Sequence, residues 1–236
     1  MQVRRPLRAT LALALLLVVS GCSLAAPDAG KPVTRDVEIA AVTAVVLTTP
    51  GELVVAVGAT PSLTVTAGAK VIDRLSSRVD EGVLRLDGSG SGPLAGAIRY
   101  ELTLPVLDAV TIEGSGEVRA DFAGGQAIAV TVKGSGEVIG ANLAATTVDA
   151  VIEGSGRIEL AGTTADQTVD IRGSGDYSAL DLSSTRASVD SAGSGDAELT
   201  VTERLTASIA GSGDIRHAGG ATVDGTIAGS GDISAL

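Results

Sequence analysis

The chain has few of the side chains that most often carry out chemistry. It contains one cysteine, one histidine, two tyrosines, one phenylalanine and no tryptophan in 236 residues. A lone cysteine excludes an internal disulfide framework, and zinc sites need Cys and His clusters that are absent here. The only histidine, His217, stands between Arg216 and Ala218 and is expected to be an exposed turn residue. Zinc chemistry and catalysis through histidine are therefore not expected, and no cofactor is predicted.

Nucleophile and phosphate motifs are missing as well. The chain is rich in Gly and Ser, yet no serine occupies a Gly-x-Ser-x-Gly elbow. No Gly-Lys-Ser/Thr follows any of the Gly-rich segments, so none of them is typical of a phosphate loop. The sequence offers no catalytic residues, and we predict that the protein is not an enzyme.

Basic residues are scarce relative to acidic ones. There are 17 Lys and Arg against 28 Asp and Glu, for a formal net charge of −11. Binding to nucleic acid depends largely on basic groups that neutralise phosphates. The balance therefore argues against a nucleic-acid partner, and also against a basic patch on an anionic lipid surface.

The N-terminus is typical of an exported protein. Arg4, Arg5 and Arg8 precede an apolar run, Leu11 to Val19, which is shorter than the roughly 20 residues that a transmembrane helix needs. A positive segment followed by a short apolar one predicts a secretory signal peptide over residues 1–21.

The signal ends in Val19-Ser20-Gly21-Cys22, which resembles the lipobox of bacterial lipoproteins. That resemblance implies lipidation of Cys22 and a membrane partner reached through the lipid anchor. The protein would be anchored to the cell membrane or the outer membrane, facing the periplasm or the cell exterior. Two or more acyl chains give firm attachment. An ordinary signal peptide with an incidental cysteine is the alternative. Residues 22–36, with two prolines and small residues, are expected to be a tether.

The most regular feature is a repeated Gly-Ser-Gly triplet. Its spacings are 20, 20, 19, 20, 18 and 18 residues, and it occurs at 114–116, 134–136, 154–156, 173–175, 193–195, 211–213 and 229–231. Apolar and polar residues alternate before each triplet, and a mostly apolar residue stands two positions after it. Period-two alternation indicates a strand with one buried face, and paired glycines allow a sharp bend between strands.

These repeats predict an all-β domain over residues 37–236, a right-handed parallel β-helix with turns of about 18–20 residues. A left-handed helix would need an aliphatic residue every six positions, and antiparallel hairpins would invert the pattern in alternate units. Neither pattern is present. Regular repeats are expected over 106–236. The segment 37–105 is expected to form irregular N-terminal turns, with Asp87 to Gly92 as a degenerate corner or a flexible loop.

The strands around Leu63-Thr64-Val65 and Asp80 to Leu84, the Leu104-Pro105 pair and the ladder of Gly-Ser-Gly-Asp/Glu corners resemble the putative auto-transporter adhesin head GIN domain. The resemblance covers residues 37–236 and is most specific from 110 onward. It implies a right-handed β-helix on an envelope protein, often a lipoprotein, and it supplies no catalytic residues.

Charged residues beside the corners test the proposed register. The residues just before the first four triplets alternate in sign: Glu113, Lys133, Glu153 and Arg172. After the last four triplets stand Asp176, Asp196, Asp214 and Asp232. Stacked turns would place these carboxylates in a column about 4.8 Å apart, where like charges repel and attract cations. One hypothesis is a calcium-binding solenoid. The other is that each carboxylate caps amide groups of its own corner.

Two functional classes follow. The first is a non-enzymatic envelope lipoprotein that presents a rigid acidic surface for binding or adhesion, with an envelope protein or a glycan as partner. The alternative is a polysaccharide-active enzyme, because β-helices host lyases and hydrolases, although fold analogy is weak support for function. Long insertions and aromatic platforms are lacking here. The last turn shows no cap for its sheet edges, and exposed edges invite pairing, so self-association through the C-terminal end is expected.

Overall fold

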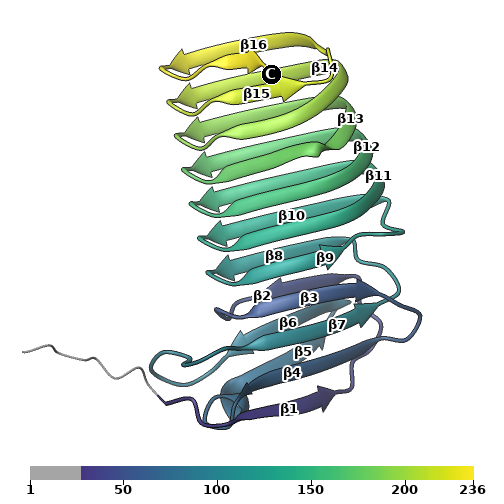
Figure 1. The fold of residues 1–236 in the computed structure, drawn as a ribbon, viewed down its shortest axis with the longest axis vertical. Helices are drawn as coiled ribbons and strands as arrows, with labels where there is room; N and C mark the ends of the chain where they lie inside the picture. Colours follow the sequence, from purple (N-terminus) through teal and green to yellow (C-terminus); the bar gives the residue numbers. More distant parts are fainter. Residues whose placement is uncertain (1–27) are drawn as a thin grey trace, which may run out of the picture.

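The computed structural model describes residues 28–236, which are almost entirely β-structure. Its strands join in one 17-stranded hydrogen-bonded sheet that coils into a solenoid with two faces (Figure 1). The one helix in this range is a 3-10 turn, Ile72–Arg74, so the described part contains no helix able to cross a membrane. The predicted solenoid with parallel stacking is confirmed.

The first face begins at the base of the stack and rises toward the C-terminus. Its separate strands, in stacking order, are β5 (Leu75–Asp80), β6 (Val83–Gly88), β2 (Ala44–Leu47), β8 (Ala109–Gly114) and β10 (Ala127–Gly134). Above them come the second halves of four long strands and then β16 (Thr222–Gly229). The long strands are β11 (Glu137–Gly154), β12 (Arg157–Gly173), β13 (Asp176–Gly193) and β14 (Ala197–Gly211).

The second face lies opposite and contains the other half of each turn. From the base it runs through β1 (Pro32–Val37), β4 (Ser62–Gly68), β7 (Arg99–Leu104), β3 (Glu52–Val57) and β9 (Glu117–Asp121). The first halves of the long strands follow, and then β15 (Ile215–Ala218) and β17 (Ile233–Ala235). Each long strand therefore leaves a corner on the second face, bends at the far side and returns on the first.

The N-terminal region differs from a simple series of turns. The turn formed by β2 and β3 lies between the turn of β6 and β7 and the turn of β8 and β9, so the stacking order does not follow the chain. Below these turns, β1, β4 and β5 pair antiparallel with their neighbours. Antiparallel strands at the base are not among the expected turns. The first strand of the described residues, β1, begins at Pro32, inside the segment expected to be a tether, and it pairs with β4 over its whole length.

The first glycine of each triplet is required by both conformation and space. All seven first glycines stack in register and have positive φ, for example 133° at Gly114 and 141° at Gly193. A Cβ on Gly193 would lie 2.0 Å from the carbonyl oxygen of Gly173 in the turn below. Residues with side chains are strained at such φ values and are too bulky for this contact.

The third glycine and the serine complete the corner. A Cβ on Gly195 would lie 2.1 Å from the carbonyl oxygen of Gly175 and 2.8 Å from the side chain of Ile171. The serine N–H of every corner after the first donates to the carbonyl of the first glycine one turn below, as from Ser194 to Gly173 at 2.8 Å. The corners therefore continue the backbone ladder between the faces of the solenoid.

The core fills the narrow space between the two faces. Inward-facing residues of equivalent positions stack in columns, which are nearly inaccessible to solvent in the turns below β16. One of them holds Val110, Val130, Ala150, Val169, Val189 and Ala207.

A small polar network also lies within this core. The Tyr177 hydroxyl donates to the side-chain oxygen of Gln167, and the Gln167 amide donates to the Ser184 hydroxyl. Ser184 in turn donates to the carbonyl of Thr200. Each of these three side chains thus has the hydrogen-bond partner that a buried polar group requires.

Candidate functional site

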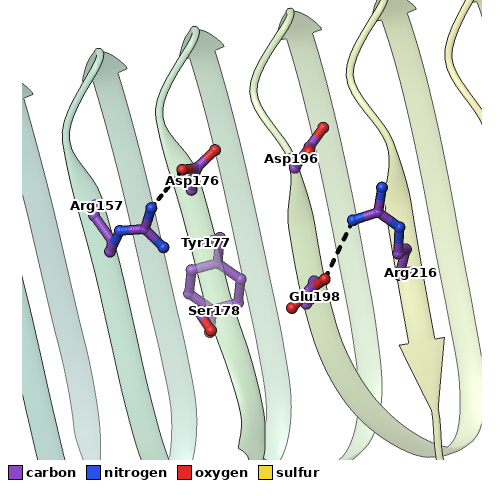
Figure 2. Close-up of a pocket in the computed structure, with 7 residues that line it drawn as sticks. All are labelled: Arg157, Asp176, Tyr177, Ser178, Asp196, Glu198 and Arg216. Carbon is purple, nitrogen blue, oxygen red and sulfur yellow. Dashed lines mark hydrogen bonds and ion pairs between the residues drawn. The ribbon is translucent and has the colours of Figure 1, made fainter. Parts of the chain in front are cut away.

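The outer surface of the second face carries a shallow charged recess of about 160 Å³. We call this the charged recess, and Figure 2 shows how its side chains lie along neighbouring turns. Arg157 borders it on one side and Arg216 on the other, with carboxylates between them. Its lining residues are Arg157, Asp176, Tyr177, Ser178, Asp196, Glu198 and Arg216.

The recess follows from the repeat. Ser178 stands in an outward-facing column between Glu159 of β12 and Glu198 of β14, and Arg216 of β15 continues that column. A serine between two longer side chains leaves a depression at that turn. The neighbouring column places Arg157 beside Asp176. The solenoid thus presents both signs of charge at the spacing of adjacent strands, about 4.8 Å.

Ion pairs hold the two guanidinium groups at the edges of the recess. Arg157 Nη2 lies 2.8 Å from Asp176 Oδ2. Arg216 Nη1 lies 3.2 Å from Glu198 Oε1, and its Nη2 lies 3.0 Å from Asp214 Oδ2. The hydrogen bond to Glu198 raises the pKa of the Arg216 guanidinium above its ordinary value. The Arg216 guanidinium therefore stays charged, and the side chains of both arginines are partly exposed to solvent.

The four aspartates predicted to form a column do lie at equivalent positions, but their carboxylates have different partners. Asp176 pairs with Arg157. The Oδ1 of Asp196 accepts the N–H of Asp214 at 2.8 Å, and the Oδ1 of Asp214 accepts the N–H of Asp232 at 3.0 Å. The amides thus belong to the next corner, and not to the same corner as expected. These bonds join successive turns where charge repulsion alone would separate them.

Cation binding by this column remains a hypothesis. Within residues 28–236, no three or more His, Cys, Asp or Glu side chains are grouped so that they could hold a metal ion. The carboxylates of Asp196 and Asp214 accept amides, and Asp214 also binds Arg216, so their charge is already partly neutralised. These contacts favour a structural role for the aspartates over calcium binding.

The expectation that His217 is an exposed turn residue is wrong. His217 lies on β15, is 8% exposed and stacks above Leu199 in an inward-facing column. The alternation explains this position, because Ile215 faces the core, Arg216 faces solvent and His217 faces the core again. Its Nδ1 atom is buried without a hydrogen-bond partner. The histidine is therefore a core residue near the outer end of the stack.

The aromatic side chains are all in the core. Tyr100, Phe122 and Tyr177 are the only aromatic residues of the chain, and each is at most 1% exposed. Burial raises the pKa of both tyrosine hydroxyls above the ordinary value. The surface therefore has no aromatic platform on which a sugar ring could stack.

The other candidate site from the sequence, Cys22, lies outside the described residues. The charged recess, in contrast, is not among the sites predicted from the sequence. Its signal is the fifth residue after the first glycine of each triplet, where the sequence reads Glu159, Ser178, Glu198 and Arg216. The alignment places these residues in one column, but it does not reveal which of them leaves a depression.

Comparisons with known proteins agree with this architecture. The family model described as "Putative auto-transporter adhesin, head GIN domain" matches residues 41–221. No curated protein matches the chain.

Three solved structures have the same fold. A putative adhesin from Bacteroides fragilis NCTC 9343 is 20% identical, with a TM-score of 0.79 over 87% of this chain and 97% of that one. A putative lipid binding protein from Parabacteroides distasonis ATCC 8503 is 22% identical, with a TM-score of 0.71 over 88% and 97%. A putative adhesin from Parabacteroides merdae ATCC 43184 is 18% identical, with a TM-score of 0.64 over 88% and 97%. The match of the family model over most of the chain shows that this protein belongs to the head GIN domain family of putative auto-transporter adhesins.

Proposed function

We propose that the protein is a non-enzymatic lipoprotein of the cell envelope that binds another envelope or surface protein through the charged recess and the strands around it. The observation that carries this proposal is the recess itself, in which Arg157 and Arg216 flank the carboxylates of Asp176, Asp196 and Glu198. The lipid at Cys22 would hold the base of the solenoid near the membrane. The strands that carry the recess, β12 to β15, lie in the upper turns, away from the base (Figure 1).

The chemistry of the recess suits a protein partner. Opposite charges at fixed positions on a rigid sheet select partners by electrostatic complementarity and reject those with the wrong charge pattern. Arginine is enriched in protein interfaces, where its planar group forms paired hydrogen bonds. The regular turns on both sides extend the recess into a wide surface without long insertions.

The position of the aromatic residues disfavours a carbohydrate ligand. Binding of sugars usually combines polar groups with an exposed aromatic ring, and every aromatic ring of this chain is buried. For the same reason, the described surface lacks the platforms that polysaccharide-active enzymes use. These observations favour a protein over a glycan as the partner, and binding over catalysis.

The test is capture of partners from the native envelope by the purified lipidated protein, at low and high salt. We expect one or more proteins to be retained at low salt and released at high salt, because salt screens exposed charges. The variant Arg216→Glu should lose this capture. Arg186→Glu is the matched control, because Arg186 pairs with Asp166 on the opposite face in a similar exposed ion pair.

Three outcomes would contradict the proposal. Equal capture by the wild type and Arg216→Glu would exclude the charged recess as the binding site. Loss of capture in both variants would show that only net charge matters. Turnover of a polyuronate panel, or saturable binding on a glycan array without protein capture, would favour the polysaccharide hypothesis instead.

A further inference from the structure

The outermost strand of the first face, β16, leaves apolar core positions uncovered. Its residues Val223 and Ile227 are 36% and 45% exposed, whereas their equivalents one turn below, Leu205 and Ile209, are at most 1% exposed. All residues of β16 are exposed. The columns that form the core thus continue into this strand without a layer above them in the described structure.

Features that usually prevent pairing at such an edge are missing from β16. Sheet edges are commonly protected by Lys, Pro or bulges, and β16 contains none of these. Residues 218–236 include only two charged side chains, Asp224 and Asp232, in an otherwise acidic protein. The end of the stack therefore carries little charge, and repulsion between two copies is weak there.

The inward-facing pattern of β16 is self-complementary. Its three inward positions are Val223, Gly225 and Ile227, and their counterparts one turn below are buried. If a second copy lies antiparallel with Gly225 at the two-fold axis, Val223 of each copy faces Ile227 of the other. Gly225 then faces Gly225, so a small pair lies between two large pairs.

The outward-facing pattern fits the same arrangement. In this register Asp224 of one copy faces Thr226 of the other, and Thr222 faces Ala228. The two Asp224 carboxylates are therefore not directly opposed, and the repulsion between directly opposed like charges is avoided. A two-fold axis perpendicular to the faces would also bring the β17 edges of the two copies together.

We propose that β16 is a homodimer interface, in which two solenoids join end to end by antiparallel pairing of β16 centred on Gly225. Pairing would satisfy the edge N–H and C=O groups and bury Val223 and Ile227. The dimer would extend the sheet of each face across both copies. The charged recess lies on the outer surface and is not covered by this contact, so dimerisation would present two recesses on one rod.

Sedimentation velocity of the chain from residue 22, with Cys22→Ser to remove the lipid attachment site and its thiol, tests the interface. We expect a monomer at low micromolar concentration and a dimer at high micromolar concentration. Ile227→Lys should remain a monomer throughout. Leu180→Lys is the matched control, because Leu180 is a similarly exposed apolar residue on the side of the stack (39%), and it should dimerise like the wild type.

A cross-linking variant tests the register without relying on a disruptive substitution. With Cys22→Ser in place, Gly225→Cys provides the only thiol of the chain, and φ at Gly225 is not positive. Directly opposed residues of an antiparallel pair have Cα atoms about 4.5–5.5 Å apart, within the range of a disulfide. Mild oxidation should therefore link Gly225→Cys into a covalent dimer and leave Leu180→Cys uncrosslinked.

The proposal is overturned if the wild type is monomeric at all concentrations, or if Gly225→Cys does not cross-link faster than Leu180→Cys. Species that grow beyond a dimer would indicate head-to-tail stacking and would also overturn it. Equal loss of the dimer in Ile227→Lys and Leu180→Lys would show that the contact lies elsewhere.

Discussion

The base of the solenoid (β1 to β7) and its body (β8 to β17) differ in how their strands pair. At the base, β1, β4 and β5 pair antiparallel with their neighbours. Arg74 stabilises the loop before β7 by donating hydrogen bonds to the carbonyls of Ser89, Gly92 and Pro93. In the body, every turn from β8 to β17 pairs parallel with the next. Every turn of the body has the same Gly-Ser-Gly corner, whereas the strands and loops of the base differ from one another.

The two regions also differ in what their glycines are needed for. Corner glycines of the body pack against the carbonyl oxygen of the turn below, so their order depends on contacts between identical turns. Glycines of the base, such as Gly82 and Gly92, have positive φ, but a Cβ added to either would have no atom within 4 Å. Gly82 and Gly92 thus serve only the conformation of their turns, whereas the corner glycines of the body are also required for stacking.

The largest expected effect separates these two roles of glycine. Gly193→Ala combines a strained φ of 141° with a clash against Gly173, and should lower the free energy of unfolding by about 3 kcal/mol or more. Gly82→Ala meets only the conformational strain and should cost about 1 kcal/mol. Urea unfolding of both variants measures the difference. Equal costs would mean that the corners are not packed against one another.

A smaller effect is expected from the buried tyrosines. Tyr177→Phe in the body leaves the side-chain oxygen of Gln167 without its donor inside a linked polar network, which should cost about 2 kcal/mol. Tyr100→Phe in the base removes one bond with Thr49, of 3.2 Å, and should cost about 1 kcal/mol. The same urea series measures both, and a larger loss for Tyr100→Phe would reverse the comparison.

The smallest effect is expected at the aspartate column of the body. Millimolar calcium should leave the melting temperature unchanged, because Asp196 and Asp214 already accept backbone amides and Asp214 binds Arg216. Asparagine retains an acceptor oxygen, so Asp196→Asn/Asp214→Asn should melt close to the wild type. A rise in the wild-type melting temperature with calcium, absent in the double variant, would establish a calcium site.

Much of the body could be predicted from the sequence because its repeat fixes both register and direction. The pairing of Glu113 with Lys133, Lys133 with Glu153 and Glu153 with Arg172 is confirmed. The base could not be predicted in the same way. The turn of β2 and β3 has no Gly-Ser-Gly corner; Thr48 to Gly51 takes its place, and its neighbours in the stack come from distant segments.

The candidate site is harder to predict than the fold. The alignment shows a column of aspartates. The backbone amides that these carboxylates accept depend on how each corner is positioned relative to the next, which the alignment does not show. The burial of His217 can be predicted only if the inward–outward alternation that starts at Ile215 is extended through Arg216 to the next residue. The charged recess depends on side-chain size within a column, and the hydrophobic pattern carries no information about this.

Hydrogen exchange, followed by mass spectrometry at low and high protein concentration, tests the contrast between the paired inner strands of the base and the open β16 edge most directly. We predict that β4 and β7 exchange slowly at both concentrations, because strands on both sides pair with them. Amides of β16 should exchange quickly in dilute protein and slowly in concentrated protein, as a second copy covers the edge. Slow exchange of β16 at every concentration, or fast exchange at every concentration, would contradict the account.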